Sequence, residues 1–118
     1  MYKATGGHLL PVDTAPSDVI RLIIEEVVKE CRPAKVILFG SYAKGKQTKD
    51  SDIDLLVITE ERMSLDDIRR MKKALSAKFG LPIQLICLTK KEFAETKDVI
   101  GGIAYPAHKY GETVYEEP

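Results

Sequence analysis

Apolar residues early in the chain recur with the period of a helix. Between residues 17 and 31 the apolar positions are three or four residues apart: Ile20, Ile23, Ile24, Val27, Val28 and Cys31. This spacing places them on one face of an amphipathic helix. Ser17 or an adjacent residue is a suitable N-cap, and Pro33 ends the helix.

Two shorter apolar runs follow, and both predict strands. Val36–Phe39 is rich in β-branched residues, and Ile53–Thr59 is a second run of the same kind. Short runs of this type are typical of buried strands. A polar, lysine-rich segment separates them. We expect a short helix over Ser41–Lys46 and then a turn through Asp50-Ser51.

The second half of the chain repeats the helix–strand alternation. Ser64 is a suitable cap for a helix that runs to about Phe79, and Asp67 is a weaker capping-box partner. Gly80 is a suitable terminator. One face of this helix is apolar, through Leu65, Ile68, Met71, Leu75 and Phe79. The run Pro82–Leu88 then predicts a third strand.

The last third of the chain has a clear helix start and a broken continuation. Thr89 and Glu92 have the spacing of a capping box, which predicts another helix. The region 98–110 is compatible with a helix but is interrupted by Gly101-Gly102 and by Pro106, which should kink or restart it. A short closing strand is expected over Thr113–Tyr115.

This order of elements predicts the fold class. Helix, strand, strand, helix, strand and helix in succession favour an α/β (α+β) layer, with a small mixed β-sheet covered by helices. The chain has 118 residues, enough for one core. Residues 1–16 show no periodicity and are interpreted as an N-terminal extension, and residues 17–118 as a single domain.

The amino-acid composition limits the classes of partner and the cellular compartment that we expect for this protein. The chain has 18 Lys and Arg residues and 18 Asp and Glu residues. Without a basic excess, nucleic acid is disfavoured as a partner, and with it an RNA-end transferase. No apolar stretch approaches membrane-spanning length and no signal peptide is recognised, so a cytoplasmic protein is expected. Cys31 and Cys87 lie inside apolar patterns and are expected to be reduced core thiols.

The candidate chemistry lies between the first two strands. Gly40-Ser41 follows the first strand, and Asp52 and Asp54 open the second. Because side chains alternate along a strand, both carboxylates point to one face and can converge on a hard cation such as Mg²⁺. Gly40 lets the backbone approach a phosphate closely, and Ser41 supplies a hydroxyl. This stretch therefore predicts a site for a nucleoside triphosphate and its magnesium.

Two other interpretations of residues 40–54 compete with a nucleoside triphosphate site. Asp and Ser are turn formers, so residues 50–54 are also compatible with a solvated turn. Residues 40–46 fit a Walker A loop up to the position that requires Ser or Thr, which is Gln47 here. A Walker A loop also leads into a long helix, whereas this segment leads into a turn and an acidic strand. The carboxylate site is the interpretation that fits the whole stretch.

The strand, Gly-Ser turn and Asp-x-Asp strand resemble the nucleotidyltransferases of the DNA polymerase β superfamily, in particular the minimal nucleotidyltransferases of prokaryotes. The resemblance covers most of the chain from about residue 17, and residues 40–58 carry the motif. It implies a polymerase β-like fold and transfer of AMP from ATP to a hydroxyl, with release of pyrophosphate. It implies that Asp52 and Asp54 bind Mg²⁺ and that Gly40 and Ser41 bind phosphate. Lys44 stands where relatives commonly carry Arg or Lys; it either contacts the triphosphate or is a solvated lysine.

One position departs from the family pattern. Active members carry a third carboxylate on the third strand, and here the polar residue of that strand is Gln84. We place Gln84 in the predicted catalytic set with Asp52 and Asp54; a solvent-facing glutamine on an edge strand is the alternative. An amide oxygen can coordinate a cation without supplying charge. Nucleotide binding can therefore survive while transfer is slowed or lost.

The resemblance also implies a partner. Small members of the family commonly pair with a helical HEPN-domain toxin, and the nucleotidyltransferase is the antitoxin that adenylylates a toxin tyrosine. We therefore expect ATP and a HEPN protein as partners. The rival hypothesis is a catalytically impaired antitoxin module, which binds nucleotide or protein and neutralises its partner by contact alone. Gln84 is the feature that favours this rival.

Overall fold

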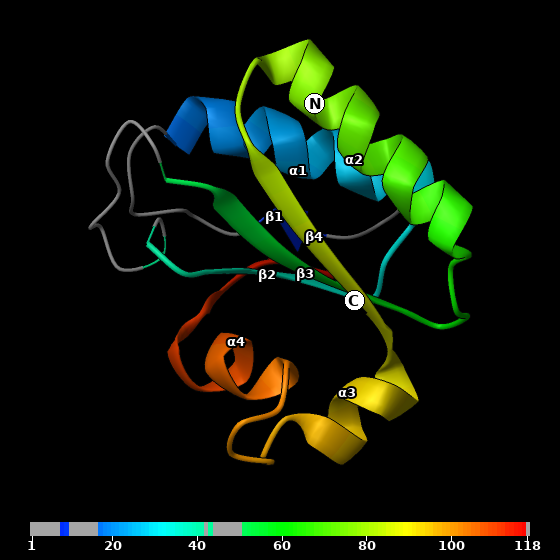
Figure 1. The fold of residues 1–118 in the computed structure, drawn as a ribbon, viewed down its shortest axis with the longest axis vertical. Helices are drawn as coiled ribbons and strands as arrows, with labels where there is room; N and C mark the ends of the chain where they lie inside the picture. Colours follow the sequence, from blue (N-terminus) through cyan, green and yellow to red (C-terminus); the bar gives the residue numbers. More distant parts are fainter. Residues whose placement is uncertain (1–7, 10–16, 42, 44–50, 118) are drawn as a thin grey trace.

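The computed structural model describes residues 8–9, 17–41, 43 and 51–117. The described elements are, in chain order, β1 (His8–Leu9), α1 (Ser17–Cys31), β2 (Lys35–Phe39), β3 (Ile53–Thr59), α2 (Leu65–Phe79), β4 (Ile83–Thr89), α3 (Lys90–Thr96), α4 (Ala104–Tyr110) and β5 (Glu112–Glu116). The strands form one sheet in the order β1-β5-β2-β3-β4. Helices α1 and α2 lie on one side of this sheet, and α3 and α4 lie on the other (Figure 1).

The sheet is mixed, as predicted. β3 and β4 pair in parallel, while β2 pairs antiparallel with both β3 and β5. Direct antiparallel pairing of β2 with β3 is incompatible with a Walker A unit, in which a helix connects parallel strands. β1 pairs with β5 at the other edge, so part of the predicted N-terminal extension joins the sheet. Residues 1–7 and 10–16 lie outside the described residues, and the division of the chain at residue 16 stays a prediction.

The larger core lies between the sheet and the α1/α2 layer. Helix α1 has the predicted bounds, and its apolar face, including Ile23 and Val27, is fully buried. In α2 the N–H of Asp67 donates to Ser64 Oγ at 3.0 Å, as the predicted cap requires. The Asp67 carboxylate pairs with Arg70 at 3.0 Å. Gly80 ends α2 in the left-handed conformation, at φ 66°, which glycine adopts without strain.

The opposite layer is built from two short helices. The predicted capping box is present: the N–H of Glu92 donates to Thr89 Oγ1, and the N–H of Thr89 donates to Glu92 Oε1. Residues 98–103 form turns and bends, and α4 begins at Ala104. The break predicted at Pro106 is therefore a restart, two residues earlier. Pro106 is tolerated because it lies in the first turn, where a backbone N–H has no partner within the helix.

Strand boundaries differ slightly from those expected. β2 begins at Lys35, β4 runs over Ile83–Thr89, and β5 over Glu112–Glu116 is longer than the predicted 113–115. Pairing with neighbouring strands extends each run beyond its apolar residues. The predicted helix over Ser41–Lys46 falls mostly outside the described residues; Ser41 and Ala43 themselves are in turns.

Candidate active site

Strand β3 sends alternate side chains to the two layers of the fold. Ile53, Leu55 and Val57 are fully buried in the core beneath α1 and α2. Leu56 and Ile58 pack in a smaller apolar cluster with Ala107 of α4. Because side chains alternate, Asp54 points to the same face as Leu56 and Ile58. The carboxylate therefore lies on the side of the sheet that carries α3 and α4, at the end where β3 begins.

Asp54 is placed by its two neighbouring strands. Its Cα partner is Phe39 on β2 and Gln84 on β4. Residues opposite each other on adjacent strands project from the same face, so Gln84 stands beside Asp54. Phe39, which was predicted only as a strand residue, forms the apolar neighbour on the other side. Its position directly before the Gly-Ser turn is the sequence signal from which this role could have been predicted.

Gly40 brings the turn after β2 onto the Asp54 carboxylate. Its φ is +78°, a conformation that residues with a side chain rarely adopt. A Cβ added at Gly40 would overlap Asp54 Oδ2 and lie 3.2 Å from Asp54 Cγ. The glycine is therefore required both by backbone conformation and by the closeness of the carboxylate. This contact joins the two halves of the sequence motif in space.

The electrostatics of the pair favour a bound cation. Burial raises the pKa of Asp54, and the negative charge of neighbouring Asp52 raises it further. Asp52 is exposed and directly precedes β3. Carboxylates gathered close together commonly hold a metal ion, whose positive charge favours their ionised form. A divalent cation between them would remove the repulsion.

Gln84 is both a solvent-facing residue of an edge strand and a neighbour of Asp54, so the two alternatives for this residue do not exclude each other. Its strand, β4, is the edge strand of the sheet and its side chain is exposed. It also stands in register with Asp54, on the same face of the sheet. An exposed amide beside a carboxylate is available to a ligand. The position fits a third ligand of a metal site, but without the negative charge that a carboxylate supplies.

The remaining predicted site residues are only partly described. Ser41 is half-buried in the turn that follows Gly40, and Lys44 lies outside the described residues. Within the described ranges, no group of three or more His, Cys, Asp and Glu side chains is close enough to hold a metal. This result agrees with a neutral residue at the third position. The donor set that fits a hard cation here is Asp52, Asp54 and the Gln84 amide oxygen.

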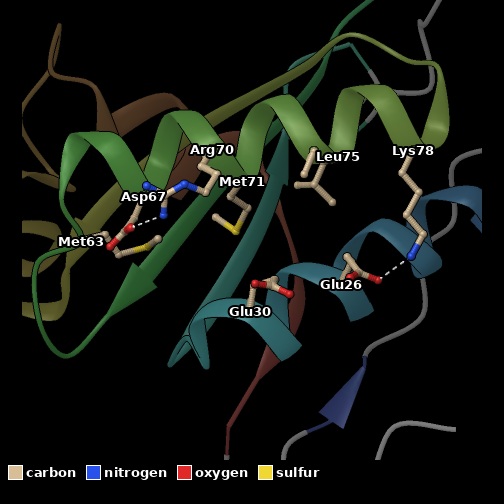
Figure 2. Close-up of a pocket in the computed structure, with 9 residues that line it drawn as sticks. Glu26, Glu30, Met63, Asp67, Arg70, Met71, Leu75 and Lys78 are labelled. Carbon is tan, nitrogen blue, oxygen red and sulfur yellow. Dashed lines mark hydrogen bonds and ion pairs between the residues drawn. The ribbon is translucent and has the colours of Figure 1, made fainter.

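A groove of about 440 Å³ lies elsewhere, between α1 and α2. Figure 2 shows Glu26 and Glu30 of α1 on one wall and Asp67, Arg70 and Lys78 of α2 on the other. Lys78 Nζ pairs with Glu26 at 2.9 Å across it. Its walls belong to the helix layer on the far side of the sheet from Asp54, so the groove is separate from the carboxylate site.

The two cysteines match their predicted structural role. Both are free, and burial raises the pKa of Cys31 to about 12 and that of Cys87 to about 11. Thiols that stay protonated at neutral pH are poor nucleophiles and metal ligands. Cys31 Sγ donates to the Val27 carbonyl at 3.2 Å.

In the described parts of the chain, no helix has the length and apolarity needed to span a bilayer.

Several known proteins are similar to this chain in sequence. Protein adenylyltransferase MntA of Thermococcus cleftensis is 34% identical over 68 residues, which cover 58% of this chain and 69% of the relative. The curated relatives are matched over 6% to 70% of their own length.

Two solved structures share the fold. A toxin–antitoxin structure, MntA–HpeT, matches 81% of this chain and 71% of its own at a TM-score of 0.64 and 15% identity. A chain from the complex of a tri-AMPylated HEPN toxin of Shewanella oneidensis with an MNT antitoxin matches 81% of this chain and 71% of its own, with a TM-score of 0.50 and 16% identity. The nucleotidyltransferase domain model matches residues 20–104, which include Gly40, both carboxylates and Gln84. Nucleotidyltransferases generally use a divalent metal, and this chain belongs to the nucleotidyltransferase domain family.

Proposed function

We propose that this protein transfers AMP from ATP to a hydroxyl group of a partner protein, with Mg²⁺ as the metal. The observation that carries the proposal is the contact between Gly40 and the Asp54 carboxylate. It brings a turn suited to phosphate binding against a carboxylate suited to metal binding. A phosphate chain held by the turn would therefore lie next to the cation that neutralises it.

The residues present fit the metal. Asp52 and Asp54 would hold it, with the Gln84 amide oxygen as a neutral third donor. Bound Mg²⁺ supplies positive charge that stabilises the phosphate oxygens as negative charge develops on them. The raised pKa of Asp54 supports this assignment, because a cation relieves both the burial and the repulsion from Asp52 that raise it.

The remaining parts of the site would bind and orient the nucleotide. Gly40 removes the Cβ that would otherwise block the approach to Asp54, and the Ser41 hydroxyl would donate to a phosphate oxygen. Lys44 is proposed as a further phosphate contact. In the reaction the acceptor hydroxyl loses its proton to water and its oxygen bonds to the α-phosphorus. The bond from that phosphorus to the β-phosphate oxygen breaks, and pyrophosphate leaves.

The proposed acceptor is a HEPN-type protein. The shared fold of the solved antitoxin, found in complex with a tri-AMPylated HEPN toxin, supports this choice. The 34% identity to a protein adenylyltransferase supports a protein acceptor and ATP as donor. The nucleotidyltransferase domain match over residues 20–104 includes the Gly-Ser turn and the two carboxylates, which is the part of the chain that the proposed reaction would use.

Gln84 supports a second candidate function, in which the protein binds its partner and nucleotide but transfers little or no AMP. A third carboxylate beside Asp54 would bring one more negative charge to the metal site, and Gln84 brings none. Without that charge the metal would be held less strongly, which would slow AMP transfer more than it would weaken nucleotide binding. In this case neutralisation of the toxin would depend on contact.

Incubation with a HEPN-domain partner, α-labelled ATP and MgCl₂ separates the two functions. The proposal predicts label on the partner, with Asp54→Ala as the inactive control. It also predicts that Gln84→Asp raises the rate about tenfold, a gain of about 1.4 kcal/mol in transition-state stabilisation. Neutralisation of the toxin without label transfer, in the wild type and in Gln84→Asp alike, would contradict the enzyme and support the binding module.

A further inference from the structure

The sheet has two very different edges. On one side the described part of the chain ends in β1, which is only two residues long. On the other side β4 pairs with β3 without interruption over seven residues, from Ile83 to Thr89. Native edge strands are usually protected by charged side chains, proline, bulges or shortness. β4 has none of these within its bounds, so its edge is open to pairing.

The register shows which backbone groups of β4 are available. The N–H of Ile53 donates to the Pro82 carbonyl at 2.9 Å. In a parallel ladder this phase directs both backbone groups of Gln84 and Ile86 toward β3. The N–H and C=O groups of Ile83, Leu85 and Cys87 therefore point outward. The outward N–H of Thr89, which follows them, is already taken by Glu92 Oε1 at 2.9 Å.

Figure 1 shows β4 in front of the rest of the sheet, with α2 above it and α3 below it. Nothing in the described ranges pairs with its outer edge. Every backbone donor and acceptor that becomes buried needs a partner, so an occupant of this edge should be an extended chain that supplies its own peptide groups. A helix or a flat surface would leave the outward groups of Ile83, Leu85 and Cys87 unpaired.

The flank of α2 beside this edge has a basic and apolar surface. Asp67, Arg70 and Lys78 line the groove with α1, so they mark the flank of α2 that faces α1 (Figure 2). Helical spacing of about 100° per residue places Leu65 and Lys72 on the opposite flank, toward the outer side of β4. Leu65 is 68% exposed and Lys72 is exposed.

Charge around the strand points in the same direction. Residues 80–91 contain no acidic residue, and Lys90 and Lys91 follow directly after the strand. Lys90 pairs with Glu60 at 2.9 Å, whereas Lys91 is an exposed lysine of the first helical turn. An occupant with acidic side chains would be attracted to this edge. In contrast, a second copy pairing through β4 would bring the Lys72 side chains of the two α2 helices together.

We propose that the outer edge of β4 binds an extended acidic segment of a partner protein, which adds to the sheet as a sixth strand beside Ile83–Cys87. Backbone pairing would supply the affinity, and the basic surface near Lys72 and Lys91 would select acidic side chains. The added strand would lie beside Gln84, which is in register with Asp54, so its acidic side chains are expected near Lys91 and away from the two carboxylates. The proposal depends on the sheet edge and not on AMP transfer, so it can fail or succeed independently of the proposed function.

Amide hydrogen exchange measured by NMR tests this binding mode, with a short capped peptide of alternating Val and Glu as the probe. The amides of Ile83, Leu85 and Cys87 are expected to exchange rapidly in the free protein, and those of Gln84 and Ile86 slowly. The peptide should slow exchange at the three outward amides about tenfold or more. A peptide of alternating Val and Lys should have no such effect.

Three variants test which groups of the protein the peptide uses. Cys87→Pro removes one outward N–H from an edge strand, where proline is tolerated, and should abolish the response to the peptide. Cys87→Val keeps the N–H and is the matched control. Lys72→Glu, which lies on the surface and leaves β4 intact, should weaken the response.

Three results would overturn the proposal. The first is no change in exchange with the acidic peptide, and the second is an equal response to the lysine peptide. The third is slow exchange of the outward amides in the free protein that becomes faster on dilution. That result would show that a second copy already occupies the edge.

Discussion

The two faces of the sheet differ in what their side chains do. Beneath α1 and α2 the sheet contributes to a continuous apolar core that includes Leu38, Leu55 and Val57. On the α3/α4 face the apolar cluster is small, with Leu56 and Ile58 at its centre. The carboxylates occupy the end of that face where β3 begins. One strand therefore contributes to both faces: Ile53, Leu55 and Val57 pack in the main core, and Asp54 carries the carboxylate proposed to bind the metal.

This division explains how the protein tolerates an electrostatically unfavourable pair. Burial disfavours the charge of Asp54 and the nearby charge of Asp52 disfavours it further, as the raised pKa of Asp54 indicates. The apolar side chains on the opposite face of the same strand stabilise the fold and offset this cost.

The largest expected effect is on AMP transfer, when the charge of Asp54 is removed. Asp54→Asn keeps the shape of the side chain but removes the charge that would hold the metal, so AMP transfer should fall about 10³-fold. Glu60→Gln removes an exposed carboxylate just beyond the other end of β3 and should leave transfer unchanged. Label transfer from ATP measures both. Equal losses in the two variants would contradict a special role for the site end of the strand.

The next largest effect is on stability, from the apolar face. Leu55→Ala removes a fully buried side chain and should lower the free energy of unfolding by about 3 kcal/mol. Leu65→Ala removes the same atoms from a side chain that is 68% exposed and should change stability by less than about 0.5 kcal/mol. Urea unfolding measures the difference. Similar values for the two variants would mean that Leu55 is not part of the main core.

Two glycines with positive φ test whether the turn after β2 is part of the nucleotide site. Gly40 and Gly80 both have positive φ, so alanine at either should cost about 1–2 kcal/mol of stability. Near Gly80 a new Cβ meets nothing within 4 Å, whereas at Gly40 it meets Asp54. Gly40→Ala should therefore also weaken Mg²⁺-dependent ATP binding, and Gly80→Ala should not. Unchanged binding in Gly40→Ala would contradict the closeness of turn and carboxylate.

The smallest expected effect is the pH dependence that Asp54 adds to stability. Its pKa is raised in the folded state, so folding favours its protonated form. Its unfavourable contribution is absent below the unfolded-state pKa and is complete once pH exceeds the folded-state pKa. At pH 7 without metal, Asp54→Asn should therefore stabilise the protein. Since the side chain is only half-buried, solvent screening limits the gain to about 0.5 kcal/mol.

Urea unfolding of wild type and Asp54→Asn at pH 7 and pH 3 measures this effect. The advantage of the variant should be present at pH 7 and shrink at pH 3. A variant less stable than the wild type at pH 7 would mean that the carboxylate is stabilised in the free protein.

Much of the fold follows from local sequence patterns. The helical periodicity of residues 17–31, the Ser64 cap and the capping box of Thr89 and Glu92 predicted their elements correctly. These signals depend on residues within one turn or one helix face, so they survive in a single sequence.

The strand order was beyond reach of the same patterns. β5 pairs with β2 although the two are more than seventy residues apart, and a bulge between Val36 and Ile37 shifts their register. Such pairing depends on the packing of the whole chain and has no local signal. The edge position of β4 and the contact of Gly40 with Asp54 follow from that order. The motif predicted the candidate site, and the sheet places Gly40, Asp54 and Gln84 next to one another.

The central claim is that Asp52 and Asp54 hold a metal-bound nucleotide, and calorimetry of ATP binding tests it most directly. Titrations with and without Mg²⁺ should be made on the wild type and on Asp52→Ala/Asp54→Ala, with Glu60→Gln as the charge control. The account predicts Mg²⁺-dependent binding in the wild type and in Glu60→Gln, and its loss in the double variant. Binding that persists in the double variant, or no binding in the wild type, would contradict it.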